Sequence, residues 1–201
     1  MKKAVIILSN IIDIPTEYLK NSLIIGADRG ALNAIMKGIK LDIAIGDFDS
    51  VNENEFNIIK DNSLKYIKLN PVKDYSDTKE AVDLVSDYDE ITILGGIKGN
   101  RIEHFIANLM LISTNNKITM IDDNSKIVVK DKSFKPDIDY KFISFYSLDD
   151  KTVISLTGFK YNLSNYNLLR KDPLCLSNEI ISNPYVDIKS GKLIVIYSKN
   201  N

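Results

Sequence analysis

The sequence predicts an α/β fold, with an N-terminal, Rossmann-like, mostly parallel sheet and flanking helices, followed by a smaller all-β sandwich domain. Through about residue 122, short β-branched runs alternate with segments of helical spacing, which is the pattern of βα units. After residue 123 this alternation is replaced by short strands between Asp, Asn, Ser, Pro and Gly. Seven of the nine glycines also lie in the first half. We therefore expect an α/β nucleotide-binding catalytic domain at residues 1–122 and a β-sandwich domain at 123–201.

The individual elements follow from the spacing of apolar residues. In the first half, β-branched runs predict strands at residues 4–8, 23–25, 43–45, 66–69, 91–94 and 118–121. Apolar residues three or four apart predict helices at residues 31–36, 55–59, 78–85 and 102–112. In the second half, strands are expected at residues 126–130, 141–146, 152–156 and 193–197.

Composition excludes several classes of protein. The 201 residues include 26 Lys and Arg against 27 Asp and Glu, and this balance argues against nucleic acid as a partner. The single cysteine, Cys175, can form no intrachain disulfide and no cysteine-based metal site, which favours a cytoplasmic protein. The apolar run after Lys3 stops at Ser9 without a cleavage site, and no stretch reaches the ~18 residues of a membrane span.

Acidic residues follow the predicted strands. Asp47 and Asp49 come directly after the strand at 43–45, and in extended backbone both side chains would point the same way. Two like charges so close favour a cation between them, and hard oxygen ligands suit Mg²⁺. The alternative is that Asp49 and Ser50 cap the helix that begins near Glu53.

Further acids lie at equivalent places after other strands. Asp28 follows the strand at 23–25, and Asp74 and Asp77 follow the strand that ends at Leu69. Because ligands of open α/β sheets bind outside the carboxyl ends of the strands, these acids should line one rim. Asp77 has an alternative role, since Asp77 and Glu80 have the spacing of a capping box.

A glycine-rich loop precedes the last predicted helix of the first half. Gly95, Gly96 and Gly99 could let backbone N–H groups and the helix N-terminus cradle phosphate, with Arg101 as a bidentate donor. The spacing is not that of a Walker A loop, and the loop could simply be a turn. His104 is the only histidine, and it could equally be a structural residue or a ligand contact.

Several segments together resemble the thiamine pyrophosphokinase family, and the resemblance spans nearly the whole chain. Gly46-Asp47-Phe48-Asp49-Ser50 is its most specific part. The other segments are Gly26 to Ala31, Lys73 to Asp77, Gly95 to Asn108, Thr157 to Leu163 and Leu176 to Glu179. Glu103 stands where the family usually has Asp, and Tyr161 stands at the place of a frequent Trp.

The resemblance implies transfer of a pyrophosphoryl group from ATP to thiamine, with Mg²⁺ as cofactor, in a cytoplasmic homodimer. It implies that Asp47, Asp49 and Asp77 bind the metal and that Arg101 acts with them in catalysis. It implies substrate-binding roles for Asp28, Lys73, Asp74, Gly95, Gly96, Glu103 and His104, and contact of Ser177 and Asn178 with thiamine. Two other hypotheses stay open. The chain could be a different Mg²⁺-dependent phosphotransferase or nucleotide pyrophosphatase, or it could be a non-catalytic module that binds nucleotide or thiamine.

Overall fold

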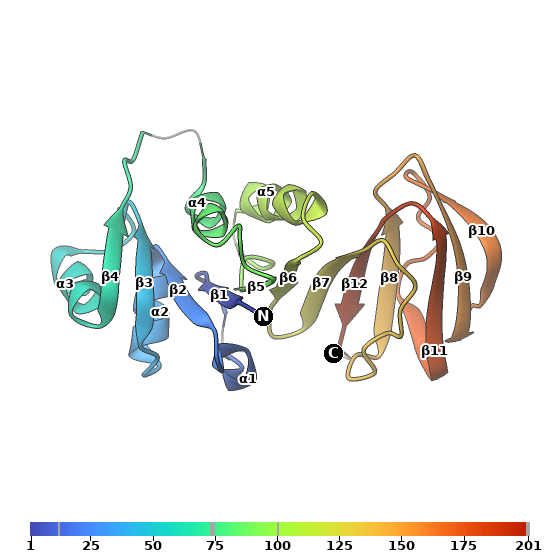
Figure 1. Ribbon diagram of the computed structural model, residues 1–201, viewed down its shortest axis with the longest axis horizontal. Coiled ribbons are helices and arrows are strands. Elements are labelled where there is room, and N and C mark those ends of the chain that lie inside the picture. Colours follow the sequence, from blue (N-terminus) through green and yellow to red (C-terminus); the bar gives the residue numbers. More distant parts are fainter. Residues whose placement is uncertain (12, 73–74, 100, 200–201) are drawn as a thin grey trace. The chain divides into compact units, whose positions relative to one another are not determined.

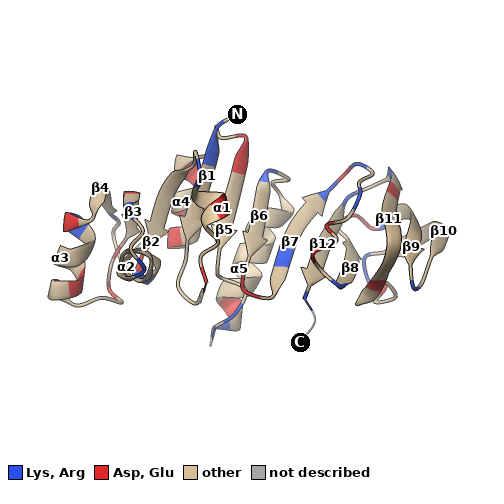
Figure 2. Cartoon of the chain, turned by 90° about the horizontal axis from the view of Figure 1, so that it is seen from below, with Lys and Arg blue, Asp and Glu red and all other residues tan. Residues whose placement is uncertain are grey.

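The structure is a computed structural model that describes residues 1–11, 13–72, 75–99 and 101–199. The chain divides into two compact units. The first contains residues 1–111 and 120–123, and the second contains residues 112–119 and 124–201. None of the helices in the described part of the chain has the length and apolar character that a membrane crossing needs. Figure 2 shows Lys and Arg interspersed with Asp and Glu along both units.

The first unit is built on a sheet with the strand order β6-β5-β1-β2-β3-β4 (Figure 1). The pairs β5–β1, β1–β2, β2–β3 and β3–β4 are all parallel. The strands are β1 (Lys3–Ile7), β2 (Leu23–Ala27), β3 (Leu41–Gly46), β4 (Ser63–Lys68), β5 (Glu90–Leu94) and β6 (Ile118–Ile121), of which only the last two residues of β6 belong to this unit. The helices are α1 (Thr16–Leu19), α2 (Arg29–Met36), α3 (Glu53–Asp61), α4 (Asp77–Leu84) and α5 (Ile102–Ser113), whose last two residues belong to the second unit.

Helices cover both faces of this sheet because its central strands are apolar on both sides. Val5 and Ile7 of β1 belong to one buried cluster with Ala31 and Leu32 of α2. Ala4 and Ile6 alternate with them and are equally buried on the opposite face, where α4 contributes its own buried residues. The α/β class predicted from the sequence is thus confirmed.

The strand order reverses direction between β1 and β5. The chain proceeds from β1 outward through β2, β3 and β4, and then returns to place β5 on the other side of β1. In open α/β sheets, such a reversal leaves a crevice at the carboxyl ends of the two strands. The topology therefore directs attention to the loops that follow β1, β2 and β5.

The second unit consists of antiparallel strands. These are β7 (Ser125–Lys130), β8 (Phe142–Ser147), β9 (Lys151–Phe159), β10 (Leu163–Leu169), β11 (Asn178–Ser190) and β12 (Leu193–Ser198). β12 pairs with β7 and β8, whereas β11 pairs with β8 at its start and with β9 over the rest of its length. The ring of Phe145 in β8 meets that of Phe159 in β9 edge to face at 6.1 Å. One cluster of buried apolar side chains, to which β8, β9, β11 and β12 all contribute, therefore forms the core of the second unit.

All strands and helices predicted from apolar spacing are present, but α1, β10 and β11 were missed. β10 is a polar edge strand with only Leu168 buried, so it lacks the alternating pattern that marks a strand. β11 contains Pro184 and has register shifts, with Asn183 in left-handed backbone. Such interruptions resemble a turn in sequence, and only pairing with β9 makes the segment a strand.

Candidate active site

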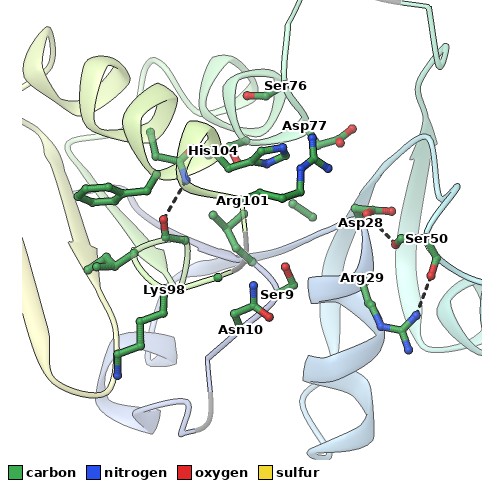
Figure 3. A pocket seen from close by; sticks show the side chains of 18 of the residues that line it. Ser9, Asn10, Asp28, Arg29, Ser50, Ser76, Asp77, Lys98, Arg101 and His104 are labelled. Atoms are coloured by element: carbon green, nitrogen blue, oxygen red, sulfur yellow. Dashed lines mark hydrogen bonds between the residues drawn. The ribbon is translucent and has the colours of Figure 1, made fainter.

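A cavity of about 400 Å³ lies in the first unit, at the carboxyl ends of β1, β2 and β5. Its lining includes Leu8, Ser9 and Asn10 after β1, Asp28 and Arg29 after β2, and Gly96 to Gly99 after β5. In Figure 3, Asp28, Arg29 and Ser50 lie on one side of the cavity, whose lining also includes Asp77, Arg101 and His104. The cavity therefore occupies the crevice that the strand order creates.

Three carboxylates gather beside this cavity. Asp28, Asp47 and Asp49 each offer an oxygen atom, and these atoms lie within 4.8 Å of one another. Gly46 permits the approach, because a Cβ at this position would lie 3.0 Å from Asp28 Cα. The resemblance implies that Asp77 binds the metal with Asp47 and Asp49. Among the described residues, the structure groups Asp28 with Asp47 and Asp49, and Asp77 lines the cavity.

The local geometry of Asp47 and Asp49 differs from the sequence prediction. Phe48 has a φ of +60°, so this segment is a tight turn and not extended backbone. The Asp49 N–H donates to the Asp47 carboxylate at 3.1 Å, and the buried Phe48 ring packs 5.0 Å from Phe56. The turn thus buries the Phe48 ring and brings the carboxylates of Asp47 and Asp49 together.

Neither capping alternative for these acids holds. Helix α3 is capped by Asn52, whose side chain accepts from the Glu55 N–H in a capping box, so Asp49 and Ser50 do not cap it. Helix α4 is capped by Ser76, whose hydroxyl accepts from the Lys79 N–H, and Asp77 is its first helical residue. Other residues thus perform both capping roles.

Asp28 has an environment that suits a cation. Its Oδ2 accepts a hydrogen bond from the Ser50 hydroxyl at 2.7 Å, whereas its Oδ1 is buried without a hydrogen-bond partner among the described residues. Burial raises the pKa of the Asp28 carboxyl above its ordinary value, although the bonds from Ser50 and the Arg29 N–H oppose this. The charges of Asp77 and Asp47 raise the pKa further. A divalent cation fits here because it would give the unpartnered oxygen a ligand and offset three negative charges.

The glycine-rich loop forms the cavity wall opposite the acids. Gly95 and Gly96 have φ values of +93° and +79°, which favour glycine, and a Cβ at Gly96 would lie 2.7 Å from Asn108 Nδ2. Lys98 extends out of the loop, with its Nζ 3.7 Å from the buried carboxylate of Asp122 (Figure 3). The loop thus needs glycine for its backbone conformation and for its close packing on α5.

Arg101 and Glu103 form an exposed ion pair at the start of α5. Arg101 Nε donates to Glu103 Oε1 at 3.1 Å, and the two side chains are 70% and 66% exposed. The pKa of the Glu103 carboxyl is lowered, first by its own backbone N–H and then by Arg101. Arg101 and His104 line the cavity, whereas Glu103 and Gly95 do not. Arg101 is therefore accessible to an anionic ligand.

The remaining predicted site residues are Lys73, Asp74, Ser177 and Asn178. Lys73 and Asp74 lie outside the described residues. Ser177 and Asn178 belong to the second unit, where the buried Asn178 side chain accepts from the Tyr161 N–H at 3.1 Å and donates to the Tyr161 carbonyl at 2.7 Å. Asn178 thereby holds the turn that presents the Tyr161 ring, which is 65% exposed.

Asn108 ends the Gly95 to Asn108 segment of the family resemblance, but it was not among the predicted site residues. This residue is 5% exposed, lines the cavity and donates from Nδ2 to the Gly96 carbonyl at 3.4 Å. The available signal was a single amide in an otherwise apolar stretch of α5. Ser9, Asn10 and Thr78 also line the cavity, but nothing in their local sequence distinguishes them from ordinary strand-end and helix residues.

Comparison with known families identifies the chain. A model of the thiamin pyrophosphokinase catalytic domain matches residues 15–136, and one of the thiamin pyrophosphokinase vitamin B1 binding domain matches residues 127–195. The chain belongs to the thiamine pyrophosphokinase family. This confirms the resemblance seen in the sequence and the prediction of an enzyme of the kinase class.

Individual relatives agree with this assignment. The thiamine pyrophosphokinase of Bacillus subtilis is 33% identical over 189 residues, which cover 89% of this chain and 88% of the relative. The crystal structure of a Bacillus subtilis thiamine pyrophosphokinase superposes with a TM-score of 0.87 at 30% identity, and each chain is covered completely. A thiamin pyrophosphokinase family protein from Enterococcus faecalis, at 24% identity with complete coverage of both chains, shares the fold with a TM-score of 0.85.

Proposed function

We propose that this chain transfers a pyrophosphoryl group from ATP to the hydroxyl of thiamine, giving thiamine diphosphate and AMP, in a reaction that requires Mg²⁺. One observation carries the proposal: Asp28, Asp47 and Asp49 meet beside a cavity of about 400 Å³ in a chain of this family. Transfer of a phosphoryl-type group depends mainly on positioning and on neutralisation of charge, which these residues are suited to supply.

Asp28, Asp47 and Asp49 would hold the Mg²⁺. The bound ion would neutralise charge on the phosphates of ATP. Metal binding by Asp77 stays a prediction, which is supported by its place in the cavity lining and by its charge, which acts on Asp28. No described residue is assigned as a general base.

The other wall of the cavity would bind the nucleotide. Arg101 is exposed at the N-terminus of α5, and a phosphate group could replace Glu103 as the partner of its guanidinium. Gly96 and Gly99 line the cavity without side chains of their own, so phosphate could approach the backbone N–H groups of this loop. We expect His104 to contact substrate, and we expect the same of Lys73 and Asp74.

The second unit would bind thiamine, whose thiazolium ring carries a fixed positive charge. The exposed ring of Tyr161 offers an aromatic face for a cation, and Lys160 Nζ already lies 5.8 Å from the ring centre, so thiamine would replace this ammonium. Because both polar groups of the Asn178 side chain bond to the Tyr161 backbone, we propose that Asn178 holds this ring in place. Contact of Ser177 with thiamine stays a prediction, and so do the homodimer and the cytoplasmic location.

A single assay tests the reaction. The protein is mixed with Mg-ATP and thiamine, and AMP, ADP and thiamine diphosphate are measured. Thiamine-dependent release of AMP with equal formation of thiamine diphosphate supports the proposal. ADP would indicate a different phosphotransferase, thiamine-independent release of AMP a pyrophosphatase, and binding of ligand without turnover a non-catalytic module.

Asp49→Asn tests the metal assignment. Asp49 is exposed, so this variant should keep the fold but lose most of the turnover. Asp61→Asn is the matched control, because Asp61 is an exposed acid at the end of α3 in the same unit. Wild-type turnover by Asp49→Asn at limiting Mg²⁺ would contradict the assignment.

A further inference from the structure

The side chain of Arg29 links helix α2 to the loop that carries Asp47 and Asp49. Arg29 is the first residue of α2, and its Nη1 donates to the Ser50 carbonyl at 2.6 Å (Figure 3). Its Nη2 lies 3.6 Å from Glu55 Oε1 in α3. One guanidinium therefore contacts both the loop and the helix that follows it.

Ser50 joins the loop to the start of α2. The Ser50 carbonyl accepts from Arg29, and the Ser50 hydroxyl donates to Asp28 Oδ2 at 2.7 Å. Beyond Ser50, Glu55 Oε2 accepts from the Asn52 N–H at 2.9 Å, so the carboxylate that pairs with Arg29 also closes the cap of α3. These bonds hold the segment directly after Asp49.

The three carboxylates need such a restraint because they repel one another. Asp28 lies at the start of α2, whereas Asp47 and Asp49 lie on the loop, and repulsion would move the loop away from the helix. The Arg29–Glu55 pair is partly exposed and contributes little. The charge-assisted bond to the Ser50 carbonyl is the stronger restraint.

We propose that Arg29 is a positioning residue that holds the Asp47–Asp49 loop against Asp28 in the arrangement that binds a divalent cation. This inference rests on the proposed metal site. It assigns no contact between Arg29 and substrate, since the residue acts through the loop.

The sign of the effect separates this role from simple electrostatics. Arg29 places a positive charge beside three carboxylates, so its removal should strengthen cation binding if charge alone matters. If Arg29 positions the loop, its removal should weaken binding in spite of the gain in negative charge. Arg29→Lys keeps the charge but loses the planar fork that reaches both Ser50 and Glu55, so it should also weaken binding.

The experiment measures binding of Mn²⁺ alone to the full-length protein by electron paramagnetic resonance, without nucleotide or thiamine. Arg29→Met and Arg29→Lys should each bind Mn²⁺ about tenfold more weakly than wild type, the usual effect of removing a residue that orients metal ligands. Arg170→Met is the matched control. In the second unit, Arg170 Nη2 donates to the Leu148 carbonyl at 2.7 Å and lies 3.5 Å from Asp150, so the change is the same in kind but far from the acids in sequence.

Equal or tighter binding of Mn²⁺ by Arg29→Met would overturn the inference and leave the proposed function intact. Failure of wild type to bind Mn²⁺ would overturn the metal site itself, and the inference with it. In the activity assay, Arg29→Met should need more Mg²⁺ for half-maximal turnover and recover at high Mg²⁺, with little change in KM for thiamine. A lowered turnover that no concentration of Mg²⁺ restores would contradict a positioning role.

Discussion

Replacement of Asn178 by Ala should destabilise the second unit and loosen the Tyr161 ring. The Asn178 side chain is 4% exposed, and it accepts from the Tyr161 N–H at 3.1 Å and donates to the Tyr161 carbonyl at 2.7 Å. These two bonds join β11 to the turn between β9 and β10, beside the bond that the Lys160 N–H donates to the Glu179 carbonyl at 2.9 Å. Alanine keeps the strand but removes both bonds.

The magnitude follows from the number of bonds lost. A hydrogen bond within a protein contributes roughly 1 kcal/mol net, so two bonds correspond to a loss of about 2 kcal/mol in the free energy of unfolding. With a urea dependence of about 2 kcal/mol per M, the midpoint of unfolding should fall by about 1 M. Tyrosine fluorescence can follow the transition, because the chain has 10 Tyr and no Trp.

The control is Asn167→Ala, which removes an exposed amide from the adjacent strand β10 and should change stability by less than about 0.5 kcal/mol. In the activity assay, Asn178→Ala should raise KM for thiamine more than it lowers kcat. A variant with wild-type stability and a raised KM would show that Asn178 contacts thiamine directly, and would refute the proposal that Asn178 holds the Tyr161 turn.

Two further substitutions test packing and protonation. Gly30→Ala should lower the free energy of unfolding by about 1–3 kcal/mol or more, because its Cβ would lie 2.3 Å from the Ile7 carbonyl oxygen and 2.8 Å from Leu8 Cα. It should also lower turnover, because α2 would be displaced. An unchanged melting temperature would contradict this reasoning. Burial raises the pKa of the Cys175 thiol from 9.0 to about 11, so an unfolded chain loses this proton first as the pH rises. Below pH 9 the Cys175 thiol does not change the free energy of unfolding. Between pH 9 and pH 11 its titration should lower that free energy by up to about 3 kcal/mol. Urea titrations of Cys175→Ala should lack this loss.

Local sequence patterns predicted the α/β class and the strand ends at which the site lies. Asp28 and Asp47 follow β2 and β3 as expected, because β-branched runs mark buried strands and parallel strands present their carboxyl ends at one edge. The capping roles were less predictable. Asn52 and Ser76 cap α3 and α4, since several neighbouring polar residues can each cap a helix and the exact start depends on packing.

The sequence by itself therefore determined which residue types lie at the rim of the sheet and to which family the chain belongs. Only the tertiary structure decided which acids meet. Asp28 joins Asp47 and Asp49 because Gly46 allows close approach, Phe48 turns the backbone to bury its ring, and Ser50 bonds across to Asp28. These contacts join segments about 20 residues apart, and their geometry depends on strand register and side-chain packing, which no local pattern encodes.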